Sequence, residues 1–375
     1  MRYDVVVLGA GINGLATAYS LKKQGVGSLA VLEQFQLGQG QGSSHGRSRI
    51  TRSTYSTPKY VELMQLVHGR LWPAWEEVAG QPLLHKNPGI FFGPGLSRYQ
   101  ESLRDLPEVN VEEVAAEEAR RRFPPFLFPD SPRVLVDHTC AVVAADRTMR
   151  FLASQLGDQV LENCQVQSIE QASQIFLDTS RGPIECERLV ITAGPWTSRL
   201  IPGLKPNLRP AHQDVGYFEI EASSRVGDFP VWVYAGEQAD DSFYGLPEFE
   251  RPGVKLARHR TGPHGDDPDR KIGTVLPEDA ARDLEAFVAQ QWSGSARLVG
   301  YDACIYTNTS NEDFILDHLP GDERIVVGAG FSGHGFKFAP LTGQVLAEMA
   351  IYGRTSFPEF ERHRAAFGFA SATCW

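Results

Sequence analysis

The hydrophobic pattern of the first 33 residues alternates short apolar runs with one amphipathic segment. Apolar runs at residues 5–8 and 29–32 predict two buried β-strands, and apolar residues at helical spacing between 15 and 21 predict a helix. Two later apolar runs, residues 188–194 and 324–330, each end on glycine. Such runs are typical of parallel strands whose carboxyl ends face a ligand crevice. The pattern predicts a βαβ unit that shares one sheet with strands from distant parts of the chain.

The segments between these strands predict a second domain. Residues 215–220 and 231–234 have the composition of strands, and no internal repeat is present. The predicted fold class is α/β: a Rossmann-like domain accompanied by an α+β domain built on a mostly antiparallel sheet. We expect the Rossmann-like domain to be discontinuous and to comprise residues 1–85, 145–205 and 305–375, with residues 86–144 and 206–304 forming the substrate-binding domain.

A glycine-rich turn joins the first predicted strand to the helix. The sequence GAGING at residues 9–14 fits G-x-G-x-x-G, whose glycines permit a tight turn, close approach to a pyrophosphate and close packing of helix on strand. The helix N-terminus adds free N–H groups. Glu33 ends the second strand, where a carboxylate accepts hydrogen bonds from a ribose and disfavours NADP. The turn predicts a dinucleotide site, and the alternative is a glycine-rich turn in a protein that binds no nucleotide.

Composition narrows the class of protein. The chain has 375 residues, 42% of them hydrophobic and 22% charged, which suits a globular protein of about two domains. Its net charge of −10 argues against a nucleic-acid binder. No apolar run reaches the ~20 residues of a membrane span, and no secretory signal is visible. Five cysteines without a CxxC pair indicate neither a metal site nor a disulfide framework, so we expect a cytoplasmic protein.

A cluster of cations follows the second strand. Residues 42–52 contain His45, Arg47, Arg49 and Arg52 within an acidic protein. Positive charge there would stabilise a developing anion, and a guanidinium binds a carboxylate bidentately. The alternative is a solvated basic loop, which charge alone favours.

Three further positions carry candidate chemistry. Lys255 lies between valine and leucine on a predicted strand, so its side chain faces away from theirs, towards either solvent or a pocket. Lys337 and His334 lie in a glycine-rich turn before a helix that starts near Pro340, where they contact a ligand or merely cap the helix. Cys304 taken alone is most simply a buried thiol.

Taken together, the motifs resemble those of the monomeric sarcosine oxidase family of amine-oxidising flavoproteins, which includes N-methyltryptophan, pipecolate and bacterial fructosyl amino acid oxidases. The resemblance covers essentially the whole chain in order. It rests on GAGING with Glu33, on GSSHGRSRITR at residues 42–52, on the strand with Lys255 and His259, on CIYTNT at residues 304–309 and on GFSGHGFKF at residues 330–338.

The resemblance implies FAD bound through a thioether from Cys304 to the flavin 8α-methyl group. The cofactor contacts that it implies are Gly9, Gly11, Ile12, Gly14, Glu33, Ser43, Ser44, His45, Arg49, Val166, Gly194, Trp196, Gly333, Gly335, Phe336 and Lys337. The implied catalytic residues are Lys255, His45, Arg49, His259 and Tyr306, with Lys255 promoting the reaction with oxygen. Arg52 and Lys337 are implied to bind the substrate carboxylate, and Tyr244, Tyr306 and His259 to line the substrate cavity.

The activity implied is oxidation of a secondary α-amino acid by FAD and oxygen, which yields an imine, then an aldehyde and an amino acid, and hydrogen peroxide. The expected partners are a small-molecule secondary amine and oxygen, and the expected state is a monomer. Arg47 and the polar stretch 235–242 depart from the sarcosine-specific pattern. A cyclic imino acid or a glycated amino acid therefore remains an alternative substrate, and a dehydrogenase that reduces a protein acceptor is a more distant alternative.

Overall fold

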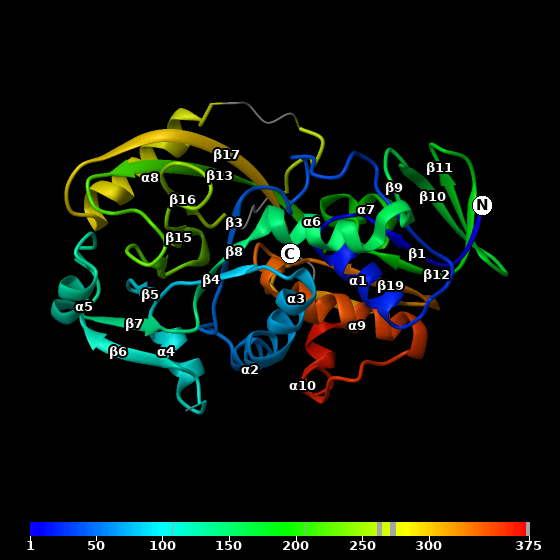
Figure 1. Cartoon of the computed structure of the whole chain (residues 1–375), viewed down its shortest axis with the longest axis horizontal. Coiled ribbons are helices and arrows are strands. Elements are labelled where there is room, and N and C mark those ends of the chain that lie inside the picture. The colour runs from blue at the N-terminus through cyan, green and yellow to red at the C-terminus, as the bar shows by residue number, and fades with distance from the viewer. Residues whose placement is uncertain (107, 206, 261–264, 271–274, 373–375) are drawn as a thin grey trace.

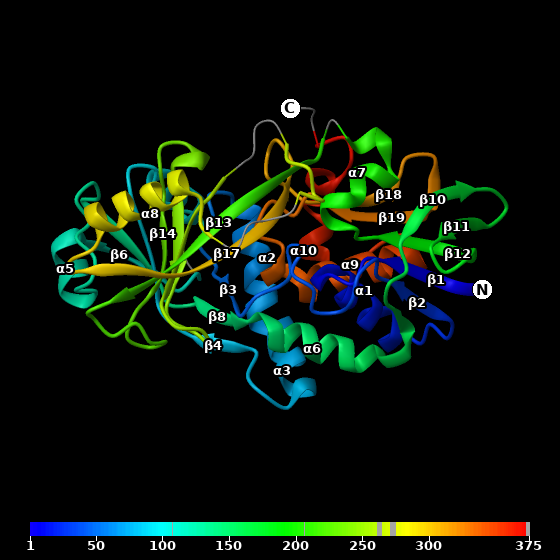
Figure 2. The same cartoon turned by 90° about the horizontal axis from the view of Figure 1, so that it is seen from above.

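A computed structural model describes residues 1–106, 108–205, 207–260, 265–270 and 275–372. The chain forms an elongated molecule with an eight-stranded sheet towards each end (Figure 1). A three-stranded sheet lies between them. Viewed from above, the two longest strands run from one lobe towards the other (Figure 2).

The first sheet contains the βαβ unit. β1 (Arg2–Leu8) pairs in parallel with β2 (Leu29–Leu32) on one side and with β12 (Ile184–Ile191) on the other. The end of β12 pairs in parallel with β19 (Asp322–Ala329), as the glycine-ended runs predicted. The sheet is completed by β9 (Val160–Leu161), β10 (Val166–Gln171), β11 (Ile175–Thr179) and β18 (Ile315–Leu319).

Helices α1 (Ile12–Lys23), α6 (Ala145–Leu156) and α9 (Ala339–Tyr352) pack together beside this sheet. The contact between α1 and α9 is close because Gly343 has no side chain; a Cβ there would lie 2.5 Å from the Cβ of Ala16. Leu15, Val7 and Val345 are fully buried in the resulting core. The core fixes the N-terminus of α1 at the carboxyl end of β1.

The second sheet is antiparallel except for one parallel pair, β14 with β5. Its order is β17 (Ala296–Asn308), β13 (Arg209–Ile220), β16 (Val254–Arg258), β15 (Phe243–Leu246), β14 (Val231–Tyr234), β5 (Gly89–Phe92), β7 (Arg133–Asp137) and β6 (Val111–Ala115). α8 (Glu278–Gln291) covers one face, where an aromatic core includes Trp232, Phe287 and Trp292. α4 (Ser97–Leu103) and α5 (Ala116–Arg122) lie at the far end.

The small central sheet has the order β3 (Ser48–Thr51), β8 (Ala141–Ala144) and β4 (Leu84–Lys86). Beside it run α2 (Pro58–Leu66), a π-helical turn (Val67–Leu71) and α3 (Trp72–Ala79). The remaining short helices are α7 (Thr197–Leu200), α10 (Pro358–Glu361) and the 3₁₀ turns Gly157–Gln159, Gly194–Trp196, Pro202–Leu204, Ala239–Asp241, Phe336–Phe338 and Arg364–Phe367.

The predicted fold class is confirmed, since a mostly parallel nucleotide-type sheet and a mostly antiparallel sheet are both present. The predicted strands at residues 215–220 and 231–234 are part of β13 and β14, and the helix expected near Pro340 is α9. Among the described residues, no helix combines the length and apolarity that a bilayer crossing requires.

Candidate active site

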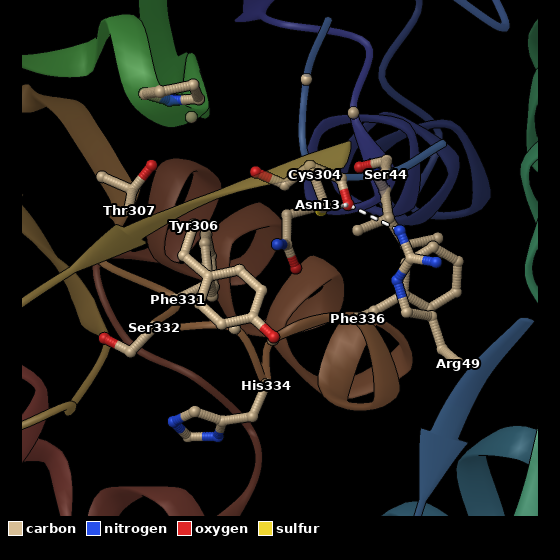
Figure 3. Close-up of a pocket in the computed structure, with 18 of the residues that line it drawn as sticks. Asn13, Ser44, Arg49, Cys304, Tyr306, Thr307, Phe331, Ser332, His334 and Phe336 are labelled. Atoms are coloured by element: carbon tan, nitrogen blue, oxygen red, sulfur yellow. Dashed lines mark hydrogen bonds between the residues drawn. The ribbon is translucent and has the colours of Figure 1, made fainter. Parts of the chain in front are cut away.

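A cavity of about 970 Å³ lies between the two large sheets. This volume is at the upper end of the range for ligand pockets. The carboxyl ends of β1, β2, β12 and β19 form one side of the cavity, while β15, β16 and β17 contribute to the other. Figure 3 shows the part where Cys304 and Tyr306 of β17 approach Arg49 and the His334 turn.

The glycine-rich turn at residues 9–14 lines one end of the cavity. Gly9 has φ of +100°, and a Cβ there would lie 2.6 Å from the carbonyl oxygen of Thr192. A Cβ on Gly14 would lie 1.8 Å from the carbonyl oxygen of Gly9. The glycines thus hold α1 against β1 and leave backbone exposed to the cavity, where Gly11 and Ile12 also line the wall. Such a cradle fits a pyrophosphate.

Glu33 and Ser44 complete this end. The Glu33 carboxylate accepts hydrogen bonds from the N–H groups of Ala10, at 2.8 Å, and Phe35, at 3.0 Å. The Ser44 hydroxyl accepts one from the N–H of Ile12 at 3.0 Å. Both side chains line the cavity. The position of Glu33 is compatible with the predicted contact to a ribose, which stays a prediction.

Val166, Gly194 and Trp196 line the same end from β10 and from the turn after β12. Gly194 has φ of +53°, which lets the chain turn from β12 into the 3₁₀ turn that carries Trp196. The Trp196 indole N–H donates to Asp269 at 2.8 Å. This hydrogen bond fixes the indole at the cavity wall.

Cys304 lies on β17 near the middle of the cavity (Figure 3). Its Sγ is 3.8 Å from the carbonyl oxygen of Ser43. Four free cysteines fall within the described part of the chain, and Cys140, Cys164 and Cys186 are buried, whereas Cys304 is partly exposed. Its access to the cavity argues against the interpretation of Cys304 as an inert core thiol.

His45 and Arg49 lie beside Cys304 and are held by main-chain oxygens. His45 lies between the carbonyl oxygens of Gly42, at 2.9 Å from Nδ1, and Ala303, at 2.8 Å from Nε2. Arg49 donates to the carbonyl oxygens of Ser43 and Ser48, each at 2.8 Å. Burial and the charge of Arg49 lower the pKa of His45. Arg49 contributes a positive charge to this wall of the cavity.

Lys255 points into the cavity from β16. Its neighbours Val254 and Leu256 face the aromatic core, so strand alternation places Lys255 on the opposite face, as predicted. The ammonium group is buried and donates to the carbonyl oxygen of Ser48 at 3.2 Å. Burial, followed by the nearby charge of Arg49, lowers the pKa of Lys255 to about 7. A lysine in this state gains or loses its proton near neutral pH.

Arg52 and Lys337 bring two buried cations to the second end of the cavity. The Arg52 guanidinium lies 4.7 Å from the ring centre of Tyr55, and the buried Nε of Arg52 has no hydrogen-bond partner in the part of the chain that the structure describes. Lys337 donates to the Tyr55 hydroxyl at 3.0 Å. Burial, then the charge of Arg52, lowers the pKa of Lys337 well below its ordinary value, and a carboxylate bound between the two residues would favour the charged form of Lys337. Within the described residues neither cation forms an ion pair with a carboxylate, which suits a site for an anionic group.

Tyr244, Tyr306 and His259 form an aromatic wall of the same cavity. The hydroxyls of Tyr244 and Tyr306 lie 2.9 Å apart, and the ring of His259 is 5.7 Å from that of Tyr306. Gly333, with φ of +74°, leaves room for Tyr306, because a Cβ there would lie 2.4 Å from its ring. A Cβ on Gly335 would likewise lie 2.6 Å from Phe331, and Phe336 lies 5.4 Å from the Arg49 guanidinium.

The structure adds two residues that the sequence motifs did not single out. Glu312 accepts a hydrogen bond from His259 at 2.8 Å; although burial raises the pKa of Glu312, this bond brings it to about 2. Tyr55 lies between Lys337 and His334. In the sequence, the position of Tyr55 three residues after Arg52 was the one indication that it belongs to the site. Arg47, in contrast, pairs with Asp146 at 3.0 Å and does not line the cavity.

The fold, the glycine-rich turn at residues 9–14 and the large cavity are together typical of an oxidoreductase that binds a flavin. The chain belongs to the FAD dependent oxidoreductase (DAO) family, whose pattern matches residues 4–349. It is 32% identical to the monomeric sarcosine oxidase of Bacillus sp. (strain B-0618) over 94% of this chain and 93% of that protein. It is 34% identical to human peroxisomal sarcosine oxidase, covering 93% and 92%. N-methyl-L-tryptophan oxidase of Salmonella dublin is 30% identical, covering 95% and 96%.

Solved structures agree on the fold. The open form of NikD, an amino acid oxidase essential for nikkomycin biosynthesis, has a TM-score of 0.79 at 22% identity and 96% coverage of both chains. Glycine oxidase from Geobacillus kaustophilus has a TM-score of 0.78 at 21% identity and 98% coverage of both chains. The predicted family is confirmed by the family pattern and by the relatives that are 30–34% identical.

Proposed function

We propose that this protein is a flavin-dependent oxidase of secondary α-amino acids of the N-methyl type, as its relatives named sarcosine oxidase and N-methyltryptophan oxidase suggest. The observation that carries the proposal is one cavity lined both by the buried cations Arg52 and Lys337 and by the hydroxyls of Tyr244 and Tyr306. Cations bind the carboxylate, and the aromatic wall encloses the amine.

The residues present fit FAD. The cradle of Gly9, Gly11 and Gly14 would hold the pyrophosphate and Glu33 the ribose, while Gly194, Trp196 and Val166 would line the adenosine side. Ser43, Ser44, His45, Arg49, Gly333, Gly335, Phe336 and Lys337 would surround the ring end. Bound FAD supplies the acceptor for the hydride equivalent that leaves the C–H bond next to the amine nitrogen.

The residues of the chain itself supply binding, orientation and charge. Arg52 and Lys337 orient the carboxylate, and Tyr244, Tyr306 and His259 exclude water from the amine and shape its site. The guanidinium of Arg49 stabilises negative charge that develops next to Cys304. Protonated Lys255 stabilises the negative charge that develops when oxygen accepts an electron, and hydrogen peroxide is the expected product.

We propose that Cys304 binds FAD covalently, because its thiol is the accessible one in the described chain and faces the cavity. Thioether formation would remove the thiol proton and one methyl hydrogen, and two electrons would pass to oxygen. Replacing Cys304 with alanine should make the flavin extractable by acid, whereas the wild-type pellet should stay yellow. Absorbance of the supernatant after acid precipitation measures this. Complete release from wild-type protein would contradict covalent attachment and leave FAD dependence intact.

Two alternative substrate classes are a cyclic imino acid and a glycated amino acid, because the polar side chains of Arg98 and Ser242 also line the cavity near residues 235–242. A panel of N-methyl, cyclic and glycated amino acids, assayed by peroxide release, distinguishes them. Formaldehyde as the second product indicates N-demethylation. Turnover that requires a protein acceptor and yields no peroxide would instead indicate a dehydrogenase and contradict the oxidase proposal.

A further inference from the structure

A buried carboxylate lies behind the segment that carries Arg52. Asp137 is the last residue of β7, and its side chain is 0% exposed. One carboxylate oxygen, Oδ2, accepts hydrogen bonds from the N–H groups of Ser53, at 3.0 Å, and Thr54, at 2.9 Å, and from the Thr54 hydroxyl at 2.8 Å. The other oxygen accepts from the N–H and hydroxyl of Thr139, at 2.8 and 2.6 Å. Burial of such a charge requires this number of donors.

The contacts of Asp137 fix the backbone on the side of Arg52 that faces away from the cavity. Thr51 and Ser53 flank Arg52, are fully buried and both contact the imidazole of His68, which lies in the π-helical turn Val67–Leu71. The hydroxyl oxygens of Ser53 and Thr139 lie 2.8 Å apart. Because the two neighbours are anchored on one side, the side chain of Arg52 is directed to the other, where it lines the cavity.

The same anchored segment leads into Tyr55. The Tyr55 hydroxyl accepts the hydrogen bond from Lys337, and its ring lies under the Arg52 guanidinium. The hydrogen bonds from Ser53 and Thr54 to Asp137 thus lie directly before Tyr55, which contacts both cations. The Arg52 guanidinium lies over the rings of Tyr55 and Phe91, so its position depends on where residue 55 is held.

We propose that Asp137 is a positioning residue that holds residues 51–55 so that Arg52 and Lys337 meet the substrate carboxylate together. The proposal rests on the proposed function, in which these two cations bind that carboxylate. Asp137 touches no substrate, and a purely structural role would give the same hydrogen bonds. The two roles differ in whether loss of the carboxylate affects carboxylate binding more than stability and flavin content.

The test uses the full-length flavoprotein and Asp137→Asn, which replaces the Oδ2 acceptor or the Oδ1 acceptor with a donor. The dissociation constant of propionate, a carboxylate without an amine, is measured from the change in flavin absorbance, and the KM of N-methylglycine from peroxide release. We expect both constants to rise by about 10- to 100-fold, the cost of misplacing a binding group by about 1 Å. Flavin content and melting temperature should match those of the control variant.

The matched control is Glu348→Gln. Glu348 on α9 is also a buried carboxylate that anchors a loop, accepting from the Thr355 hydroxyl at 2.8 Å and from the N–H of Ser356 at 2.5 Å, and it does not line the cavity. It should leave propionate binding unchanged. Thr139→Val, which removes one hydroxyl donor to Asp137, should raise the propionate dissociation constant above the wild-type value but by a smaller factor. If Asp137→Asn does not fold, this rise over wild type tests the proposal.

The outcomes separate the two proposals. If Arg52→Met weakens propionate binding but Asp137→Asn and Thr139→Val do not, Asp137 has no positioning role and the proposed function stands. If Arg52→Met also leaves propionate binding unchanged, the carboxylate site, and the proposed function with it, is wrong. Loss of stability and flavin with an unchanged propionate dissociation constant would assign Asp137 a structural role only.

Discussion

Replacing Lys255 with methionine is expected to slow the reaction of the reduced enzyme with oxygen by about 10²- to 10³-fold, the typical cost of removing one preorganised donor to a developing charge. The ammonium is buried, so nothing in the solvent replaces it. Reduction by the amine should change far less, because the carboxylate and aromatic contacts remain. Stopped-flow measurement of the two half-reactions, the first without oxygen, separates these effects.

The rate of the wild-type reaction with oxygen should also depend on pH, and the pKa of Lys255 fixes the direction of that dependence. The pKa of Lys255 lies at about 7 because burial and Arg49 disfavour the charged form, while Asp302 favours that form and Arg251 opposes it. The reaction with oxygen should be fastest when Lys255 is protonated and should decline as the pH rises through about 7 and above. Negative charge on a neighbouring group would move the decline to higher pH, and Lys255→Met should abolish it.

The control for this experiment is Lys22→Met. Lys22 also donates to a main-chain carbonyl oxygen, that of Gln155 at 2.6 Å, but it is exposed and does not line the cavity. Its loss should leave both half-reactions unchanged. An oxygen reaction that is equally fast in Lys255→Met and wild type would remove Lys255 from the proposed mechanism.

The sequence predicted the fold well where local pattern and packing agree. The strand β1, the turn GAGING and the helix α1 follow from apolar runs and from glycines whose missing side chains the structure explains. Cys304 needed more than its own pattern: apolar neighbours suggest a core thiol, and only the pairing of β17 with β13 beside the loop that carries Ser43 opens it to the cavity. The predicted domain boundaries stay predictions.

The sequence predicted the placement of a charged residue that interrupts an apolar pattern. It did not predict residues whose role depends on contacts with distant parts of the chain. Lys255 could be placed on the right face by alternation with Val254 and Leu256. Arg47 looked equivalent to Arg52 as a cation, but its partner Asp146 lies about a hundred residues further along the chain. Asp137 gave no signal, since a buried acid at the end of a strand has no sequence pattern that marks its partners.

Replacing Arg52 with methionine is expected to lower kcat/KM for N-methylglycine by about 10²- to 10³-fold. Truncating one partner of a buried charge pair costs about 2–5 kcal/mol, and each 1.4 kcal/mol corresponds to about tenfold. Most of the loss should lie in KM and in the propionate dissociation constant, because the carboxylate would remain buried beside Lys337 alone. Arg52→Lys keeps the charge but loses the planar fork, so its effect should be smaller.

Arg47→Met is the matched control for the carboxylate site. It removes an arginine five residues away that pairs with Asp146 and is half exposed, so kcat/KM should be unchanged. Lys337→Met should resemble Arg52→Met, because the two cations share one anionic ligand and both contact Tyr55. If the Arg52 and Lys337 variants keep the wild-type KM, the substrate carboxylate does not bind between these two residues, and the orientation of the amine towards Tyr244 and Tyr306 proposed above is wrong.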